Sequence, residues 1–229
     1  MAKVIRAGEA GLSRRLEIPR FRHQSTFATG CYSARVVKTA STQWLAPGAR
    51  APDFALPDTE GRLRRPADLR GEHGLVVAFI CNHCPFVKHI RSGLAEFGRD
   101  YAARGLGLVA INSNDAASHP DDAPGTMAAE RRSAGYTFPY LHDESQAVAQ
   151  AYRAACTPDF FVFDRDLRLA YRGQFDDSRP GLDLPVTGAD LRAACDALIA
   201  GRPVGAAQKP SLGCNIKWKP GLEPAWFGG

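Results

Sequence analysis

Two cysteines separated by two residues, Cys81 and Cys84, follow directly after the apolar run 75–80. Thiols at this spacing can close a disulfide or share a metal ion, and a position between a buried strand and a helix favours redox use. The N-terminus of that helix would carry a partial positive charge, which favours thiolate over thiol. We therefore predict that Cys81 lies exposed on the turn as the nucleophile. Cys84, shielded in the first helical turn, would then resolve the mixed disulfide.

His83 lies between the two cysteines and is a candidate for tuning them. A cationic or hydrogen-bonding imidazole beside Cys81 would stabilise its thiolate, and so the reduced form. Reduced-form stabilisation makes a disulfide more oxidising, so the predicted reduction potential lies above the thioredoxin value of about −270 mV. An exposed turn histidine without a special contact would leave the potential unchanged.

The other four cysteines lack the density and regular spacing of a secreted disulfide scaffold. A reducing compartment is therefore expected. Cys156 and Cys214 are candidates for an auxiliary redox role, although Cys156 could equally be a small buried apolar residue. Cys195 lies in the apolar stretch of a predicted helix and is assigned to the core, and Cys31 carries no inference.

Composition and charge argue against a nucleic-acid or membrane-spanning protein. The chain of 229 residues has a net charge of +5, 45% hydrophobic and 23% charged residues, which is ordinary for a globular protein. Residues 1–44 hold eight Lys/Arg and only two acidic residues, whereas the rest hold 21 and 22. The folded part is thus almost neutral. No apolar run reaches the roughly 20 residues that a membrane-spanning helix needs.

Three segments are predicted along the chain. Residues 1–44 form a basic, acid-poor extension that is either disordered or an organelle transit peptide. Residues 45–205 form the folded domain, and residues 206–229 form an irregular tail. The predicted localisation is cytoplasmic, with organelle import as the alternative if residues 1–44 act as a transit peptide.

The domain is expected to be α/β, with a central mixed β-sheet and helices on both faces. Continuous apolar runs at 74–80 and 106–111 predict strands buried on both faces. Apolar residues at three- and four-residue steps predict a helix over 85–104. Further strands are predicted at 53–56, 62–64, 159–163 and 168–171, and further helices at 126–134, 144–154 and 187–200.

Four segments of the chain resemble the thioredoxin-like superfamily, specifically its peroxiredoxin-like branch related to alkyl hydroperoxide reductase and thiol-specific antioxidant. They are Ala51-Pro52-Asp53-Phe54, Phe79 to Lys88 around the CNHCP motif, Cys156 to Phe161, and Gly213 to Trp218. The resemblance covers about three quarters of the chain. It implies the thioredoxin-like fold and a redox role. It also implies that Thr157-Pro158 is a cis-proline site facing the two cysteines, where a cis X–Pro bond leaves a backbone edge free for substrate.

The sequence departs from the patterns of both relatives near the cysteines. Peroxiredoxins have a threonine three residues before the peroxidatic cysteine and a proline four residues earlier still, where this chain has Cys81 and Val77. Thioredoxin has a buried aspartate six residues before its nucleophile, where this chain has Leu75. A peroxidatic mechanism at Cys84 and an acid–base role at position 75 therefore lack their usual residues.

The leading hypothesis is a thiol–disulfide oxidoreductase whose catalytic residues are Cys81, Cys84, His83, Thr157 and Pro158. A thiol peroxidase with Cys156 or Cys214 as resolving residue is the second hypothesis. A copper- or zinc-binding module is the third, because thiolates and imidazole bind these metals. For the leading hypothesis we expect no cofactor and no metal. The expected partners are a protein or small-molecule disulfide and a thiol reductant; the oligomeric state is left open.

Overall fold

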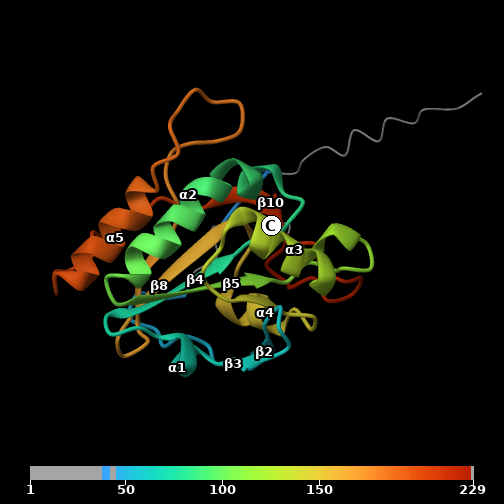
Figure 1. Cartoon of the computed structure of the whole chain (residues 1–229), viewed down its shortest axis with the longest axis horizontal. Coiled ribbons are helices and arrows are strands. Elements are labelled where there is room, and N and C mark those ends of the chain that lie inside the picture. Colours follow the sequence, from blue (N-terminus) through green and yellow to red (C-terminus); the bar gives the residue numbers. More distant parts are fainter. Residues whose placement is uncertain (1–37, 42–44, 228–229) are drawn as a thin grey trace, which may run out of the picture. The chain divides into compact units, whose positions relative to one another are not determined.

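A computed structural model describes residues 38–41 and 45–227 of the chain (Figure 1). Its central sheet has five strands in the order β6-β5-β4-β8-β9. The three strands β4, β5 and β6 are parallel, whereas β8 and β9 form an antiparallel hairpin against β4. The strands are β4 (Gly74–Phe79), β5 (Leu106–Asn112), β6 (Tyr140–His142), β8 (Asp159–Asp164) and β9 (Leu169–Gly173).

Helices cover both faces of this sheet, as predicted (Figure 1). Residues of β4 contribute alternately to two apolar clusters, with Val76 and Ala78 in one and Val77 and Phe79 in the other. This alternation follows from the two-residue period of a strand, and it explains why the whole run is apolar. The helices are α1 (Pro66–Leu69), α2 (Pro85–Ala102), α3 (Pro124–Ala134), α4 (Ala147–Tyr152) and α5 (Ala189–Ile199), with a 3-10 turn η1 (Pro120–Asp122).

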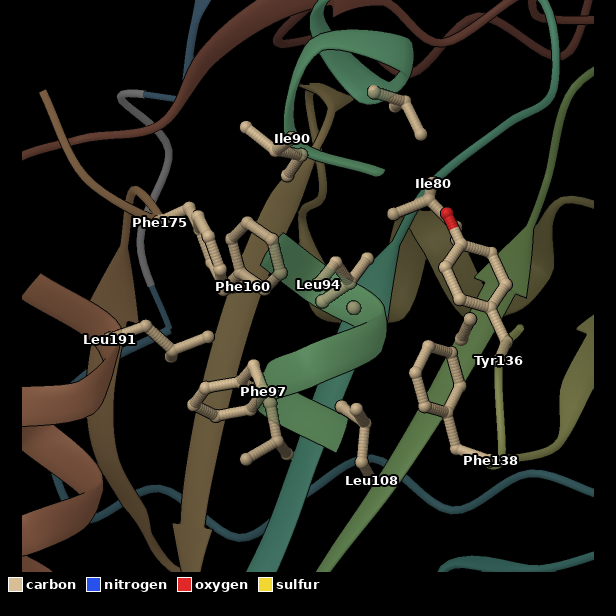
Figure 2. Packing of buried hydrophobic residues seen from close by; sticks show 14 of the residues in the cluster. Ile80, Ile90, Leu94, Phe97, Leu108, Tyr136, Phe138, Phe160, Phe175 and Leu191 are labelled. Atoms are coloured by element: carbon tan, nitrogen blue, oxygen red, sulfur yellow. The ribbon is translucent and has the colours of Figure 1, made fainter. Parts of the chain in front are cut away.

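The first cluster lies between the sheet and helices α2 and α5 (Figure 2). Leu94 and Phe97 of α2 pack there with Phe160 of β8 and Leu191 of α5. The second cluster covers the other face and is centred on Tyr152 of α4, whose ring meets those of Phe79, Phe161 and Phe163 edge-on. Together the two clusters fix the ends of β4 and α2, which carry the two cysteines.

Two smaller sheets complete the fold. β2 (Leu56–Pro57) and β3 (Leu63–Arg64) form a short hairpin, while β1 (Lys38–Ala40), β10 (Leu212–Asn215) and β7 (Cys156–Thr157) form an antiparallel sheet in the order β1-β10-β7. Within the described residues, no helix is both long enough and apolar enough to cross a membrane.

The predicted segment boundaries differ from the structure in two places. The sequence predicts that residues 38–41 belong to the basic extension, but β1 pairs with β10, and the hydroxyl of Ser41 donates to Asp159 at 2.5 Å. It predicts an irregular tail over 206–229, but β10 lies there and pairs with β7. Short strands paired over long sequence separations leave little local pattern, which is why both were missed. Residues 1–37 and 42–44 lie outside the described residues.

Candidate functional site

The two cysteines lie where β4 ends and α2 begins. The N–H of Ile80 still bonds the carbonyl of Ile111, and α2 then starts at Pro85 with Cys84 as its N-cap residue. Both cysteines are buried, Cys81 with 1% and Cys84 with 0% of its surface exposed. The predicted exposure of Cys81 is therefore wrong. The backbone N–H of Asn82 bonds Asp122 at 2.7 Å, which ties the turn between the cysteines to the loop containing η1.

Thr157 contacts both sulfur atoms. The Sγ atom of Cys81 lies 3.4 Å from its hydroxyl, and the Sγ atom of Cys84 lies 3.2 Å from its carbonyl oxygen. The peptide bond from Thr157 to Pro158 is cis. The structure thus brings together four of the five predicted site residues from two distant segments.

The surroundings of the two cysteines favour Cys84 as the ionised member of the pair. Hydrogen bonds from the thiols of Cys214 and Cys81 lower the pKa of Cys84, and the backbone N–H of Val87 in the first turn of α2 adds to this effect. Burial raises the pKa of Cys81 well above its ordinary value, as do its hydrogen bond to Cys84 and the charge of Asp122. The sequence predicts the thiolate at Cys81. The structure favours Cys84, chiefly because the thiols of Cys214 and Cys81 hydrogen-bond its sulfur, and also because Cys84 and not Cys81 is the N-cap residue of the helix.

The charge on Cys84 predicts an unusual pH dependence for the reduced protein. We expect the ultraviolet absorbance of one thiolate to persist as the pH falls well below about 8.5, where ordinary cysteines become protonated. The sign follows from the lowered pKa of Cys84, which keeps that sulfur ionised in acid. An absorbance titration of the reduced protein measures this. Cys84→Ser should remove the acid-stable signal, and Cys195→Ser should keep it; a signal that Cys84→Ser retains would place the thiolate elsewhere.

His83 is paired with Asp122. Its Nδ1 atom lies 2.6 Å from an Asp122 carboxylate oxygen, and the ring stacks on that of His119 with centroids 4.8 Å apart. Asp122 is fully buried and also accepts from the side-chain amide of Asn114 at 2.9 Å. Burial raises the pKa of Asp122, but the hydrogen bonds from His83, Asn114 and the Asn82 N–H outweigh it, so the pKa is lowered and the carboxylate is ionised.

The pairing of His83 with Asp122 gives a different cause for the predicted effect of His83 on the reduction potential, but the direction of that effect stays the same. In His83→Ala the buried carboxylate of Asp122 loses its partner, and its negative charge then acts more strongly against the negative charge that the reduced cysteine pair carries. The reduced form is then less stable, and we expect the reduction potential to fall by roughly 30–60 mV, since one pKa unit corresponds to about 30 mV. Equilibration in glutathione redox buffers, read by mass after alkylation, measures the shift. His73→Ala is the matched control. If His83→Ala had the same reduction potential as the parent, His83 would have no effect on the cysteine pair.

Comparisons with known proteins now identify the family. The AhpC/TSA family matches residues 47–172. The chain belongs to the AhpC/TSA family. It is 31% identical over 113 residues to "Putative peroxiredoxin Rv2521" of Mycobacterium tuberculosis, covering 49% of this chain and 67% of that protein. It is 30% identical over 122 residues to the thiol-disulfide oxidoreductase ResA of Geobacillus thermodenitrificans, covering 53% of this chain and 66% of that protein.

The chain is also similar to proteins of solved structure. An uncharacterized conserved protein from Geobacillus kaustophilus is 53% identical with a TM-score of 0.78, over 80% of this chain and 97% of that one. Peroxidoxin BcpB from Mycobacterium tuberculosis has a TM-score of 0.52 at 18% identity, over 69% of this chain and 99% of that one, which supports the fold alone. The predicted α/β thioredoxin-like fold is confirmed, and the family places the protein among redox enzymes.

The remaining described cysteines of this AhpC/TSA-family protein differ in their surroundings. Cys214 of β10 pairs in register with Thr157, and its thiol bonds Cys84. Cys156 is fully buried and donates to the carbonyl of Pro158 at 3.6 Å. Burial, and then the charge of Asp159, raises the pKa of Cys156, so this thiol is held neutral. Cys195 is buried in α5, as predicted. Cys31 lies outside the described residues.

Asp122 is the main site residue that the sequence did not reveal. It supplies a buried carboxylate near Cys81 from the loop after β5, whereas thioredoxin carries its acid on the strand at the position of Leu75. Tyr140 of β6 was also missed; its hydroxyl donates to the side chain of Asn82 at 3.0 Å. The sequence did contain a signal for Asp122, because the carboxyl ends of neighbouring parallel strands meet at one edge of the sheet. The polar loop at 118–125 follows the strand next to the one that precedes Cys81, so its side chains lie near the cysteines.

One group of described residues could hold a metal ion. Ligand atoms of Cys81, His83 and Asp122 lie within 4.8 Å of one another. The Asp122 carboxylate already accepts hydrogen bonds from His83, Asn114 and Asn82, so a metal ion would have to replace the first of these. The arrangement as it stands satisfies its polar atoms without a metal.

Proposed function

We propose that this protein is a thiol–disulfide oxidoreductase that works through a dithiol–disulfide pair of Cys81 and Cys84. The observation that carries the proposal is the contact of both sulfur atoms with Thr157, beside Pro158, combined with a lowered pKa at the N-cap cysteine. The proposed partners are a protein or small-molecule disulfide and a thiol reductant. A reducing compartment suits this role.

The charge distribution sets the order of attack. The lowered pKa makes Cys84 the favoured thiolate of the reduced protein, and thiolates are the attacking species in disulfide exchange. Cys84 attacks the substrate disulfide and releases one substrate thiolate. Cys81 then attacks the Cys84 sulfur of the mixed disulfide, and the second substrate thiol leaves. This order reverses the one predicted from the sequence, in which Cys81 attacks and Cys84 resolves.

Access of a substrate to the cysteines requires a movement of the protein. A hollow next to Pro158 has room for about one water molecule, and both apolar and polar side chains line it, among them Phe86, Phe175, Asp176 and Arg179. A substrate side chain does not fit there as the structure stands. Because both sulfurs are buried, the surrounding loops must move to admit the substrate disulfide itself.

Insulin reduction in the presence of dithiothreitol tests the proposal, together with peptide mapping of the oxidised protein. We expect catalysed turnover and a disulfide between Cys81 and Cys84. Cys81→Ser should retain the first attack of Cys84 and release one substrate thiol, but it should not form a disulfide between positions 81 and 84. Wild-type protein that neither forms this disulfide nor exceeds the rate of dithiothreitol alone would refute the proposal.

A thiol peroxidase is the second candidate, favoured by the hydroxyl of Thr157. The threonine of the peroxiredoxin motif is replaced by Cys81, yet a threonine hydroxyl from β7 lies 3.4 Å from that sulfur. The lowered pKa of Cys84 also suits attack on a peroxide. Stopped-flow reaction with hydrogen peroxide separates the two functions. A rate no faster than that of a free thiol would dismiss the peroxidase, and Thr157→Val should slow any faster reaction.

A further inference from the structure

Strand β10 lies along the edge of β7, directly beside the cysteine pair. Its register places Cys214 opposite Thr157, the residue that contacts both redox sulfurs. Gly213 permits this approach, because a Cβ atom there would lie 2.0 Å from the Thr157 carbonyl oxygen and 3.1 Å from the nitrogen of Pro158. No other residue type fits at position 213 without displacing the strand.

This placement gives Cys84 two thiol neighbours. The thiols of Cys214 and Cys81 both hydrogen-bond its sulfur. All three cysteines are buried, with Cys214 5% exposed. A sulfur flanked by two thiols can form a disulfide with either of them, and a buried neighbour competes with any external thiol because it is already in place.

We propose that Cys214 is a third redox cysteine, which forms a disulfide with Cys84 and hands it on to Cys81. The proposal rests on the proposed function, since it requires Cys84 to react with a disulfide substrate. It extends that function by giving the enzyme a second oxidised form, in which β10 is tied covalently to the N-terminus of α2.

The steps balance without any further reagent. Cys84 attacks a low-molecular-weight disulfide and expels one thiolate. Cys214 loses its proton and attacks the Cys84 sulfur, and the second thiolate leaves and takes up a proton. The substrate disulfide is thereby reduced to two thiols and the protein is oxidised. Cys81 then loses its proton and attacks the same Cys84 sulfur, which expels Cys214 as a thiolate. Cys214 takes up a proton, and the Cys81–Cys84 disulfide remains.

The charge on Cys84 determines when Cys214 can react. While Cys84 is a thiolate, its hydrogen bond and charge, together with burial, raise the pKa of Cys214, so Cys214 stays protonated. Once Cys84 enters a mixed disulfide that negative charge is gone. The pKa of Cys214 then falls, and its thiolate becomes available when there is a bond to attack.

Cys81→Ser exposes this reaction because it removes the competing thiol. The protein is reduced, desalted, mixed with oxidised glutathione, quenched by alkylation in acid, and mapped by mass spectrometry. We expect a Cys84–Cys214 disulfide and at least a tenfold lower yield of glutathione on Cys84 than in Cys81→Ser/Cys214→Ser. Cys81→Ser/Cys156→Ser is the matched control and should still form the Cys84–Cys214 disulfide.

The outcomes separate this inference from the proposed function. A stable glutathione adduct on Cys84 with Cys214 alkylated would overturn the inference and leave the proposed function standing. Failure of Cys84 to react at all in wild type and variant would overturn both. A disulfide from Cys84 to Cys156 in the first variant would also overturn the role of Cys214.

Gly213→Ala tests the same inference through the backbone. The added Cβ must move β10 away from Thr157, so in the Cys81→Ser background we expect at least a tenfold slower closure of the Cys84–Cys214 disulfide. Gly205→Ala, where a Cβ meets nothing within 4 Å, is the control and should close at the parent rate. Equal rates in the two variants would show that β10 does not position Cys214, and the near-ultraviolet circular dichroism spectrum reports whether each is folded.

Discussion

Cys84→Ser is expected to lower insulin reduction to the rate of dithiothreitol alone. Serine does not ionise in the neutral range, so the sulfur anion at the N-cap of α2 is lost. If Cys81 took over with an ordinary thiol pKa, only a few per cent of it would be thiolate at pH 7, and turnover would fall about 30-fold. Burial raises the pKa of Cys81 above that value, which makes the expected loss larger.

A comparison of three variants makes this prediction specific to Cys84. Cys195→Ser removes a buried thiol of α5 that touches none of the redox sulfurs, and it should keep the parent rate. Cys81→Ser should keep the first attack of Cys84 on insulin, so it should lose less activity than Cys84→Ser although it forms no Cys81–Cys84 disulfide. If Cys81→Ser lost the first attack while Cys84→Ser kept it, the order predicted from the sequence would be restored.

The position of the helix start explains why the order of attack is hard to read from a CxxC motif. The helix N-terminus stabilises a negative charge most strongly on the N-cap residue, because that residue faces the unpaired N–H groups of the first turn. The sequence predicts the helix from residue 85 but assigns the effect of its N-terminus to Cys81. Pro85 fixes the first helical position, since proline lacks an N–H and has a φ suited to that position. Cys84 therefore becomes the N-cap.

The sheet and its helices could be predicted because their signals are local. The run at 74–80 is apolar throughout, as a strand covered on both faces must be, and it forms β4 at Gly74–Phe79. The predicted helix 85–104 corresponds to α2 at Pro85–Ala102, with Leu94 and Phe97 facing the core. The hairpin at 159–171 corresponds to β8 and β9.

The contacts that define the site were less predictable because they join distant segments. β10 spans four residues, of which Gly213 and Cys214 carry no strand signal. The pairing of His83 with Asp122 crosses 39 residues, and nothing in the local sequence of either shows it. β6, with three residues, was also missed. The sequence therefore located the two cysteines and Thr157 but not the strand and the carboxylate that surround them.

A buried ion pair behind the site carries the largest expected effect on stability. Asp159 follows Pro158 and is fully buried, and an Arg172 nitrogen lies 3.7 Å from its carboxylate. Ser41 of the segment after β1 donates to the same carboxylate at 2.5 Å and is itself bonded by Arg172. The guanidinium also lies over the ring of Phe161, 5.2 Å from its centroid. This network joins β8, β9 and the N-terminal strand at the start of the cis-proline segment.

Arg172→Met is expected to lower the free energy of unfolding by about 3 kcal/mol at neutral pH, because it leaves a buried carboxylate without its cation. Burial already raises the pKa of Asp159, and Arg172 counteracts that rise. Without Arg172 the folded-state pKa moves further above the unfolded value of about 3.9. Asp159 then binds its proton more tightly in the folded than in the unfolded protein. The free energy of unfolding therefore falls as the pH rises from the unfolded-state pKa through the folded-state pKa, and this loss is absent at a pH below both values.

Urea unfolding at neutral pH and near pH 4 measures both parts of this prediction. The loss of stability in Arg172→Met should be largest at neutral pH and should shrink in acid, where Asp159 is protonated. Arg168→Met changes an exposed arginine in the same hairpin, and its unfolding free energy should stay within about 0.5 kcal/mol of the parent at both pH values. Arg172→Met/Asp159→Asn removes the charge and should recover part of the loss at neutral pH. A loss of equal size at both pH values would mean that Arg172 stabilises the fold by packing on Phe161 and not by its charge.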